Sequence, residues 1–226
     1  MSLRSRAVAT LIRHLIVRVA FLMLFAWTFH YWQAWAFVTV LFLADAATSL
    51  YLYRKDPALL ERRLGQGVRA RSEETAAQQK VQRVVQLLML TTMAVAATDH
   101  RRDWSSVSAP VCVVGLALMA VALYMVFLVF KTNSYAAATV QVEENQQVVS
   151  TGPYALVRHP MYSSLTLQLI AQPLALGSLW ALLPGVVLSA VLAVRALDEE
   201  KFLASNLAGY TEYMSRVRHR LVPLVW

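Results

Sequence analysis

Long apolar runs without charged side chains alternate with short polar segments along the first half of the chain. A helix that crosses a bilayer needs about 20 mostly apolar residues, and a charged side chain inside the bilayer is costly. The aromatic segment HYWQ at residues 30–33 separates the first two runs and is typical of an interfacial belt. The pattern therefore predicts four amino-terminal membrane helices, the third of them short, near residues 11–29, 32–53, 84–98 and 104–130.

A further apolar interval, residues 159–194, has a different form, because prolines and glycines interrupt it. At about 1.5 Å per helical residue it is too long for one crossing of the bilayer and too short for two full ones. We expect a tight helical hairpin that turns near residues 173–180. Its flanking arginines, Arg158 and Arg195, then lie on the same side of the membrane.

The composition agrees with a multi-pass membrane protein. Of the 226 residues, 58% are hydrophobic and 15% are charged, which excludes a disordered, collagen-like or ordinary soluble chain. The formal charge of +8 comes from basic residues that lie between the apolar runs, so nucleic-acid binding is not expected. A single cysteine, Cys112, forms no disulfide within one chain, and the histidines are scattered, so no metal site is expected.

Basic residues also predict an orientation. They are concentrated before the first run and in the polar loop at residues 54–83, whereas the loop at 99–107 has as many acidic as basic residues. By the positive-inside tendency the amino terminus, the ends of the hairpin and the tail are cytoplasmic. Within the membrane, Asp45 is either a functional residue or the partner of Arg18 or of neighbouring hydroxyl groups.

Candidate chemistry gathers at the two ends of the hairpin. Pro160 follows His159 and is well suited to a first helical turn, so His159 lies at a helix amino terminus that favours a carboxylate or phosphate. Arg195 and Glu199 are four residues apart and share a helical face, which the hairpin turns toward His159 and Tyr162. These groups form either a ligand site or merely a helix start and a solvated helical turn.

Several motifs resemble one family. The stretches STGPYALVRHPMY, EEKFL, GYTEY and RHRLVPLVW, in this order around the hairpin, resemble the isoprenylcysteine carboxyl methyltransferases and their wider relatives, which include phospholipid N-methyltransferases. The loop RKDPALLERRLGQG is similar to a segment of bacterial members. The resemblance implies one all-α membrane domain, residues 1–226. In it, membrane helices at 1–130 precede a cytosolic region at 131–226 that binds S-adenosylmethionine.

The resemblance also implies site residues. Arg195 and Glu199 take the catalytic positions, Arg195 facing the methyl acceptor and Glu199 closing the cofactor pocket. Ser163 and Ser164 stand where family members commonly have glycine, which suggests a change of substrate. The positions expected to contact the cofactor are Gln141, Gln146, Gln147, Val148, Val149, Tyr154, His159, Pro160, Met161, Tyr162 and Glu199.

The expected reaction is methyl transfer from S-adenosylmethionine to a lipophilic acceptor from the bilayer, foremost the carboxylate of an isoprenylcysteine-like compound. Such a carboxylate needs no base, whereas an amine acceptor needs one, from Glu200, Asp198 or Tyr162. The alternatives are a phospholipid or amine N-methyltransferase, an NADPH-dependent membrane sterol-type reductase, and a scaffold or transporter without catalysis. We expect a bacterial inner-membrane protein with a cytoplasmic active site and no obligate protein partner.

Overall fold

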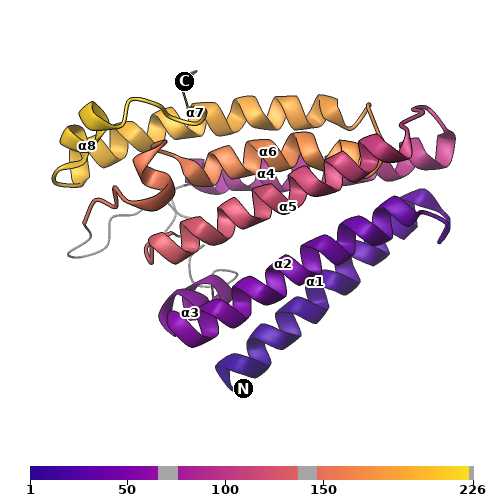
Figure 1. Cartoon of the computed structure of the whole chain (residues 1–226), viewed down its shortest axis with the longest axis horizontal. Helices are drawn as coiled ribbons and strands as arrows, with labels where there is room; N and C mark the ends of the chain where they lie inside the picture. The colour runs from indigo at the N-terminus through magenta and orange to yellow at the C-terminus, as the bar shows by residue number, and fades with distance from the viewer. Residues whose placement is uncertain (66–75, 137–146, 224–226) are drawn as a thin grey trace.

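The computed structural model describes residues 1–65, 76–136 and 147–223, with the backbone alone at residues 65 and 76–82. The described residues form helices and no strand, which confirms the all-α prediction. In Figure 1, α5, α6 and α7 lie side by side, and α1 and α2 form a pair on the other side of α5. The helices are α1 (Leu3–Ala26), α2 (Trp32–Lys55), α3 (Pro57–Gly65), α4 (Ala76–Arg102), α5 (Ala109–Thr132), the 3-10 helix η2 (Gly152–Ala155), α6 (Pro160–Ala175), α7 (Leu182–Asn206) and α8 (Tyr210–Arg216).

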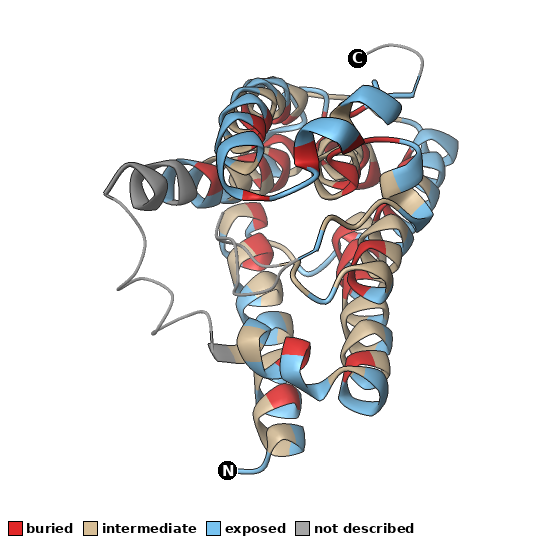
Figure 2. Ribbon diagram, turned by 90° about the vertical axis from the view of Figure 1, so that its left-hand side faces the viewer, coloured by how far each residue is buried: buried red, intermediate tan, exposed pale blue. Residues whose placement is uncertain are grey.

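Among the described residues, three helices are long and apolar enough to cross a membrane: α1, α2 and α5. They correspond to the first, second and fourth predicted membrane helices. Many of their apolar side chains are exposed, among them Ile16, Leu24, Leu43, Leu50, Val113 and Val121. Figure 2 shows exposed and intermediate residues over much of the helices, with the buried ones in short stretches between them. An exposed apolar surface of this kind suits a lipid environment.

The first membrane helix begins earlier than the apolar run suggested. Ser2 caps it, since its hydroxyl accepts a hydrogen bond from the Ser5 N–H at 3.2 Å, and the helix starts at Leu3. Its end is also earlier, at Ala26, because Trp27 adopts a left-handed conformation with φ 53°.

The third helix is longer than predicted. Residues 84–98 lie inside α4, which has 27 residues and runs from Ala76 to Arg102. No glycine or proline interrupts this stretch, so the helix continues through its polar flank. It ends where Asp103 turns left-handed, with φ 51°.

The fourth helix begins at Ala109, five residues later than predicted, with Pro110 in its first turn. The residues before it are held by α4 instead. The carboxylate of Asp99 accepts hydrogen bonds from the Ser105 N–H at 2.7 Å and from its hydroxyl at 2.6 Å. This contact closes the α4–α5 loop.

The predicted hairpin is confirmed. Its arms are α6 and α7, and Gly177 makes the turn between them with φ 74°, a conformation that glycine adopts without strain. Ser178 in the turn donates a hydrogen bond to Asp99 at 2.5 Å, and both side chains are buried. The turn is thereby tied to the α4–α5 loop.

Helices α5 and α6 pack with their backbones in close approach. A Cβ atom placed on Gly115 would lie 2.3 Å from the backbone nitrogen of Ala175 and 2.7 Å from the carbonyl carbon of Leu174. No side chain fits at Gly115, so these two helices are held against each other at this depth.

Two expectations for the amino-terminal helices have different outcomes. Asp45 pairs with Arg18, its carboxylate 2.7 Å from the guanidinium, which confirms the ion pair among the alternatives. The interfacial belt expected at residues 30–33 stays a prediction. Tyr31 is fully buried, stacks on His100 and donates its hydroxyl to the Leu176 carbonyl at 2.7 Å. The phenol finds a partner inside the bundle, as a buried hydroxyl requires.

Candidate functional site

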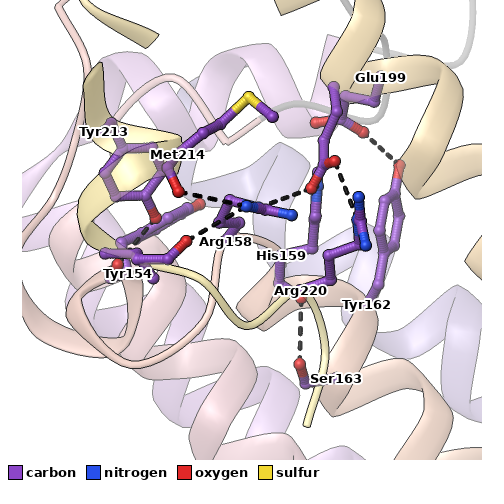
Figure 3. Close-up of polar contacts among 11 residues, drawn as sticks. Tyr154, Arg158, His159, Tyr162, Ser163, Glu199, Tyr213, Met214 and Arg220 are labelled. Atoms are coloured by element: carbon purple, nitrogen blue, oxygen red, sulfur yellow. Dashed lines mark hydrogen bonds and ion pairs between the residues drawn. The ribbon is translucent and has the colours of Figure 1, made fainter. Parts of the chain in front are cut away.

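The start of α6 lies against the carboxy-terminal tail. The backbone N–H of Arg158 donates to the His219 carbonyl, and that of His159 donates to the Arg220 carbonyl, both at 2.9 Å. The hydroxyl of Ser163 lies 2.5 Å from the Leu221 carbonyl (Figure 3). The tail is thus bound to the RHP segment through backbone groups.

A buried carboxylate joins these segments to α7. Glu200, only 4% exposed, lies with Oε1 2.7 Å from Arg158 Nε and 3.2 Å from His159 Nε2, and with Oε2 3.0 Å from Arg220 Nε. Arg158 also donates to the carbonyls of Met214 and Val217. One carboxylate therefore organises the helix start, the tail and the second arm of the hairpin (Figure 3).

These contacts determine the protonation state of Glu200. Burial alone would raise its pKa, but hydrogen bonds from His159 and Arg220 and the charge of Arg158 outweigh this effect and lower the pKa to about 2. A carboxylate accepts hydrogen bonds only, so His159 Nε2 carries the proton between them. A carboxylate with so low a pKa is a poor base at neutral pH, which argues against the role as a base considered for Glu200.

A second hydrogen-bonded set connects the two arms of the hairpin. The hydroxyl of Tyr162 on α6 donates to Glu199 Oε2 at 2.6 Å and accepts from Arg195 Nε at 3.0 Å. The predicted convergence of Arg195 and Glu199 on Tyr162 is therefore present. The imidazole of His159 stacks on the Tyr162 ring, with the centroids 5.6 Å apart, but its partner on α7 is Glu200 rather than Glu199.

Tyr154 lies in η2, between the end of α5 and the tail helix α8. Its hydroxyl accepts a hydrogen bond from the Asn133 amide at 2.9 Å, and its carbonyl accepts one from the Tyr213 hydroxyl at 2.8 Å. Burial raises the pKa of Tyr154 to about 12, partly offset by the Asn133 bond, so the phenol stays protonated. Asn133 and Tyr213 thus fix the position of Tyr154.

Other predicted cofactor positions are distributed around this set. Pro160 is buried at the start of α6, and Val148 packs against Leu207, Tyr210 and Tyr213. Met161 packs against the apolar cluster that contains Phe130. Gln147 is exposed and Val149 half-buried, whereas Gln141 and Gln146 lie outside the described residues. The cofactor contacts proposed for these residues stay predictions.

The two serines in place of glycine have structural partners. Ser164 is buried and donates to the Pro160 carbonyl at 2.7 Å within α6, while Ser163 contacts the tail carbonyl of Leu221. The hydroxyl of Ser163 provides an attachment for the tail that glycine lacks.

Sequence reasoning assigned no role to Asn133, Tyr213 and Arg220. It treated Arg158 only as a residue flanking the hairpin and Glu200 only as a possible base. The side chains of these five residues hold the predicted ones in place, and each residue belongs to a polar or aromatic segment near a predicted motif. Arg158 directly precedes His159, and Glu200 directly follows Glu199. Their positions beside predicted site residues were the sequence signal that could have indicated a buried ion pair. Nothing in the sequence pattern pointed to Asn133.

The site offers no metal centre within the part of the chain that the structure describes, since no group of three suitable side chains occurs there. It offers donors for an organic ligand instead. The first-turn N–H groups of Met161 and Tyr162 have no backbone partner among the described residues. The Tyr210 hydroxyl is buried without a hydrogen-bond partner in the described part of the chain.

Comparison with known proteins adds one match. The phospholipid methyltransferase family model matches residues 111–208, less than half of the chain, and no curated protein matches significantly. The matched stretch includes the hairpin and the residues Tyr154, His159, Tyr162, Arg195 and Glu199, but ends before the tail. Over this stretch the chain is similar to a membrane methyltransferase family related to isoprenylcysteine methyltransferases.

Proposed function

We propose that this protein transfers a methyl group from S-adenosylmethionine to a lipophilic acceptor at the cytoplasmic face of a bacterial inner membrane. The observation that carries the proposal is the position of the Tyr162 hydroxyl between Arg195 and Glu199, beside the amino terminus of α6. The family match over the same residues supports it.

The residues present fit S-adenosylmethionine. The N–H groups at the start of α6 and the positive end of that helix suit the carboxylate of the cofactor. Glu199 provides an acceptor for its hydroxyl or amino groups, and the protonated Tyr154 and Tyr162 provide aromatic surfaces for its cation. When bound, the cofactor supplies an electrophilic methyl group to a nucleophile.

Within this reaction, positioning is the main contribution of the chain. Arg195 binds and orients the acceptor with its planar guanidinium, and Tyr162 fixes the plane of that guanidinium by accepting from Nε. Glu200 keeps the start of α6 and the tail together and contacts no reacting atom.

A carboxylate acceptor, as in an isoprenylcysteine-like compound, fits this site best. It is ionised at neutral pH and needs no base, and the buried Glu200, with a pKa of about 2, provides none. Asp198 is exposed and pairs with Lys201, away from the Tyr162 set. An amine acceptor is the second candidate, favoured by the match to phospholipid methyltransferases, and Glu199 would be its nearest base.

The binding test is calorimetric titration of the detergent-solubilised protein with S-adenosylhomocysteine and with NADPH. We expect S-adenosylhomocysteine to bind wild type, Arg195→Ala and the control Lys201→Ala alike, and to bind Glu199→Gln at least about tenfold more weakly, as for a lost charged hydrogen bond. NADPH binding without S-adenosylhomocysteine binding would assign the protein to the reductases. Binding of neither would leave a scaffold or transporter.

The acceptor test is transfer of a labelled methyl group to an isoprenylcysteine analogue and to phosphatidylethanolamine. We expect label on the isoprenylcysteine analogue, with turnover reduced in Arg195→Ala and unchanged in Lys201→Ala. Label on the lipid amine alone would replace the carboxylate by the second candidate.

A further inference from the structure

A separate cavity lies among the amino-terminal helices, between α1, α2, α3 and α5. Its volume is about 160 Å³. Most of its wall is apolar, with leucines and the Phe130 ring, but His14, Asp45, Thr48 and Arg63 also face it. It combines an apolar wall with charged and hydroxyl groups.

The charged side chains that line this cavity differ in whether they form an ion pair. The carboxylate of Asp45 is paired with Arg18 at 2.7 Å. The guanidinium of Arg63 lies over the Phe130 ring, 3.8 Å from its centroid, and forms no ion pair with any residue that the structure describes. Asp45 also acts electrostatically on Arg63, but its carboxylate is already paired with Arg18, so among the described residues these three groups carry a net positive charge. The hydroxyls of Thr48 and Ser49 line the same cavity.

The location restricts the ligand. Two walls of the cavity belong to α1 and α2, which are apolar enough to span a membrane, and α3 follows α2 directly. Arg63 lies in the last turn of α3 beside Arg62, and basic residues close to a membrane helix are attracted to anionic lipid head groups. A ligand at this depth has an anionic group for Arg63 and apolar chains for the leucines.

We propose that this cavity binds the phosphate-bearing head group of a membrane phospholipid. Arg63 pairs with the phosphate, because a guanidinium forms strong hydrogen bonds to phosphate oxygens. The hydroxyls of Thr48 and Ser49 donate to the remaining oxygens, and the apolar wall contacts the first carbons of the acyl chains. This site is distinct from the set around Tyr162, and the proposal does not rest on the methyl-transfer function.

The two sites nevertheless adjoin. Phe130, which carries the Arg63 guanidinium on its face, belongs to the same apolar cluster as Met161 at the start of α6. A bound phospholipid therefore contacts the layer of side chains on which the start of α6 packs.

The test is native mass spectrometry of the full chain in detergent with phosphatidylglycerol, with diacylglycerol of the same acyl chains, and with inorganic phosphate. We expect phosphatidylglycerol to bind wild type, and to bind Arg63→Ala about tenfold or more weakly, as for a lost charged hydrogen bond. Arg54→Ala is the matched control, because Arg54 is exposed near the same end of α2 and does not line the cavity. Thr48→Val, a smaller change, is expected to weaken binding in the same direction.

Each other result overturns the proposal. Equal phosphatidylglycerol binding by Arg63→Ala and Arg54→Ala, when both unfold at the wild-type temperature, removes Arg63 from any such site. Diacylglycerol binding as tight as phosphatidylglycerol binding removes the phosphate from recognition. Inorganic phosphate that binds through Arg63 while phosphatidylglycerol does not makes the ligand a free anion instead of a lipid.

Discussion

Arg158 and Glu200 form a buried ion pair, with Nε 2.7 Å from Oε1. It joins the segment just before α6 to α7, the second arm of the hairpin. Both side chains are less than a tenth exposed. Burying two charges is costly unless their hydrogen-bonding capacity is used, and here backbone carbonyls, His159 and Arg220 use it. The pair therefore stabilises the contact between the start of α6, the tail and α7 only while both charged side chains are present.

Glu200→Gln is expected to destabilise the protein strongly. Removing one partner of a buried ion pair costs about 3–5 kcal/mol, because the other charge stays buried. Thermal unfolding in detergent should show a clearly lower midpoint for the variant. The control is Asp198→Asn, two residues away, whose exposed pair with Lys201 is worth little. Equal midpoints for the two variants would contradict the buried pair.

The same carboxylate predicts a pH dependence. The pKa of Glu200 is about 2 in the folded state, below the ordinary value of 4.5, so its contribution is complete above pH 4.5 and is lost as the pH falls toward 2. The stability difference between wild type and Glu200→Gln should therefore shrink as the pH falls from about 4.5 to about 2. Unfolding measured at several pH values checks this, and a difference that grows with acid would refute it.

Two neighbouring tyrosines should respond oppositely to loss of the hydroxyl. Tyr213 donates to the Tyr154 carbonyl, so Tyr213→Phe leaves a carbonyl without this donor and costs about 1 kcal/mol. The Tyr210 hydroxyl is buried without a partner among the described residues, so Tyr210→Phe should be neutral or stabilising in the ligand-free protein. Unfolding midpoints of the matched pair test this, and the reverse order would show that these bonds are wrongly assigned.

Tyr162→Phe should reduce methyl transfer. The change removes the acceptor for Arg195 and the donor to Glu199 while it keeps the ring that stacks on His159. A charged hydrogen bond contributes about 1.5–3 kcal/mol, so we expect turnover to fall about tenfold or more. Tyr124→Phe, on the exposed face of α5, is the control for loss of a phenol hydroxyl. Unchanged turnover in Tyr162→Phe would separate this tyrosine from the reaction.

Gly115→Ala should separate α5 from α6. The added methyl group would overlap the backbone of Ala175, which cannot yield as a flexible side chain can. Overpacking of this kind typically costs about 1–3 kcal/mol or more. Ala117→Val, which adds volume on the exposed face of α5, should change the unfolding midpoint little. A tolerated Gly115→Ala would mean that the two helices are less closely packed.

The sequence was sufficient to predict the hairpin and part of the site, because each follows from a local rule. Pro160 marks the start of α6, and the four-residue spacing of Arg195 and Glu199 places both on one face of α7. The turn at Gly177 follows from the interruption of the apolar run.

The partners of His159 and Tyr31 depend on packing that no local rule contains. Glu199 and Glu200 are adjacent, about 100° apart around the helix, and the spacing does not say which one meets the imidazole. The attachment of the tail uses backbone groups of His219 and Arg220, which leave no side-chain pattern. Tyr31 is an aromatic residue at a helix break, a feature as compatible with an interface as with the interior where it lies.

The contact at Gly115 also limits how a lipophilic acceptor could reach the proposed methyl-transfer site from the bilayer. Where the backbones of α5 and α6 touch, no gap is left for an alkyl chain to slide in sideways from the bilayer. Lateral entry from the bilayer is therefore restricted to the other helix–helix interfaces. Gly115 allows α5 and α6 to pack backbone to backbone, and this packing blocks entry between these two helices. A lipid-like molecule must therefore approach from another side of the bundle.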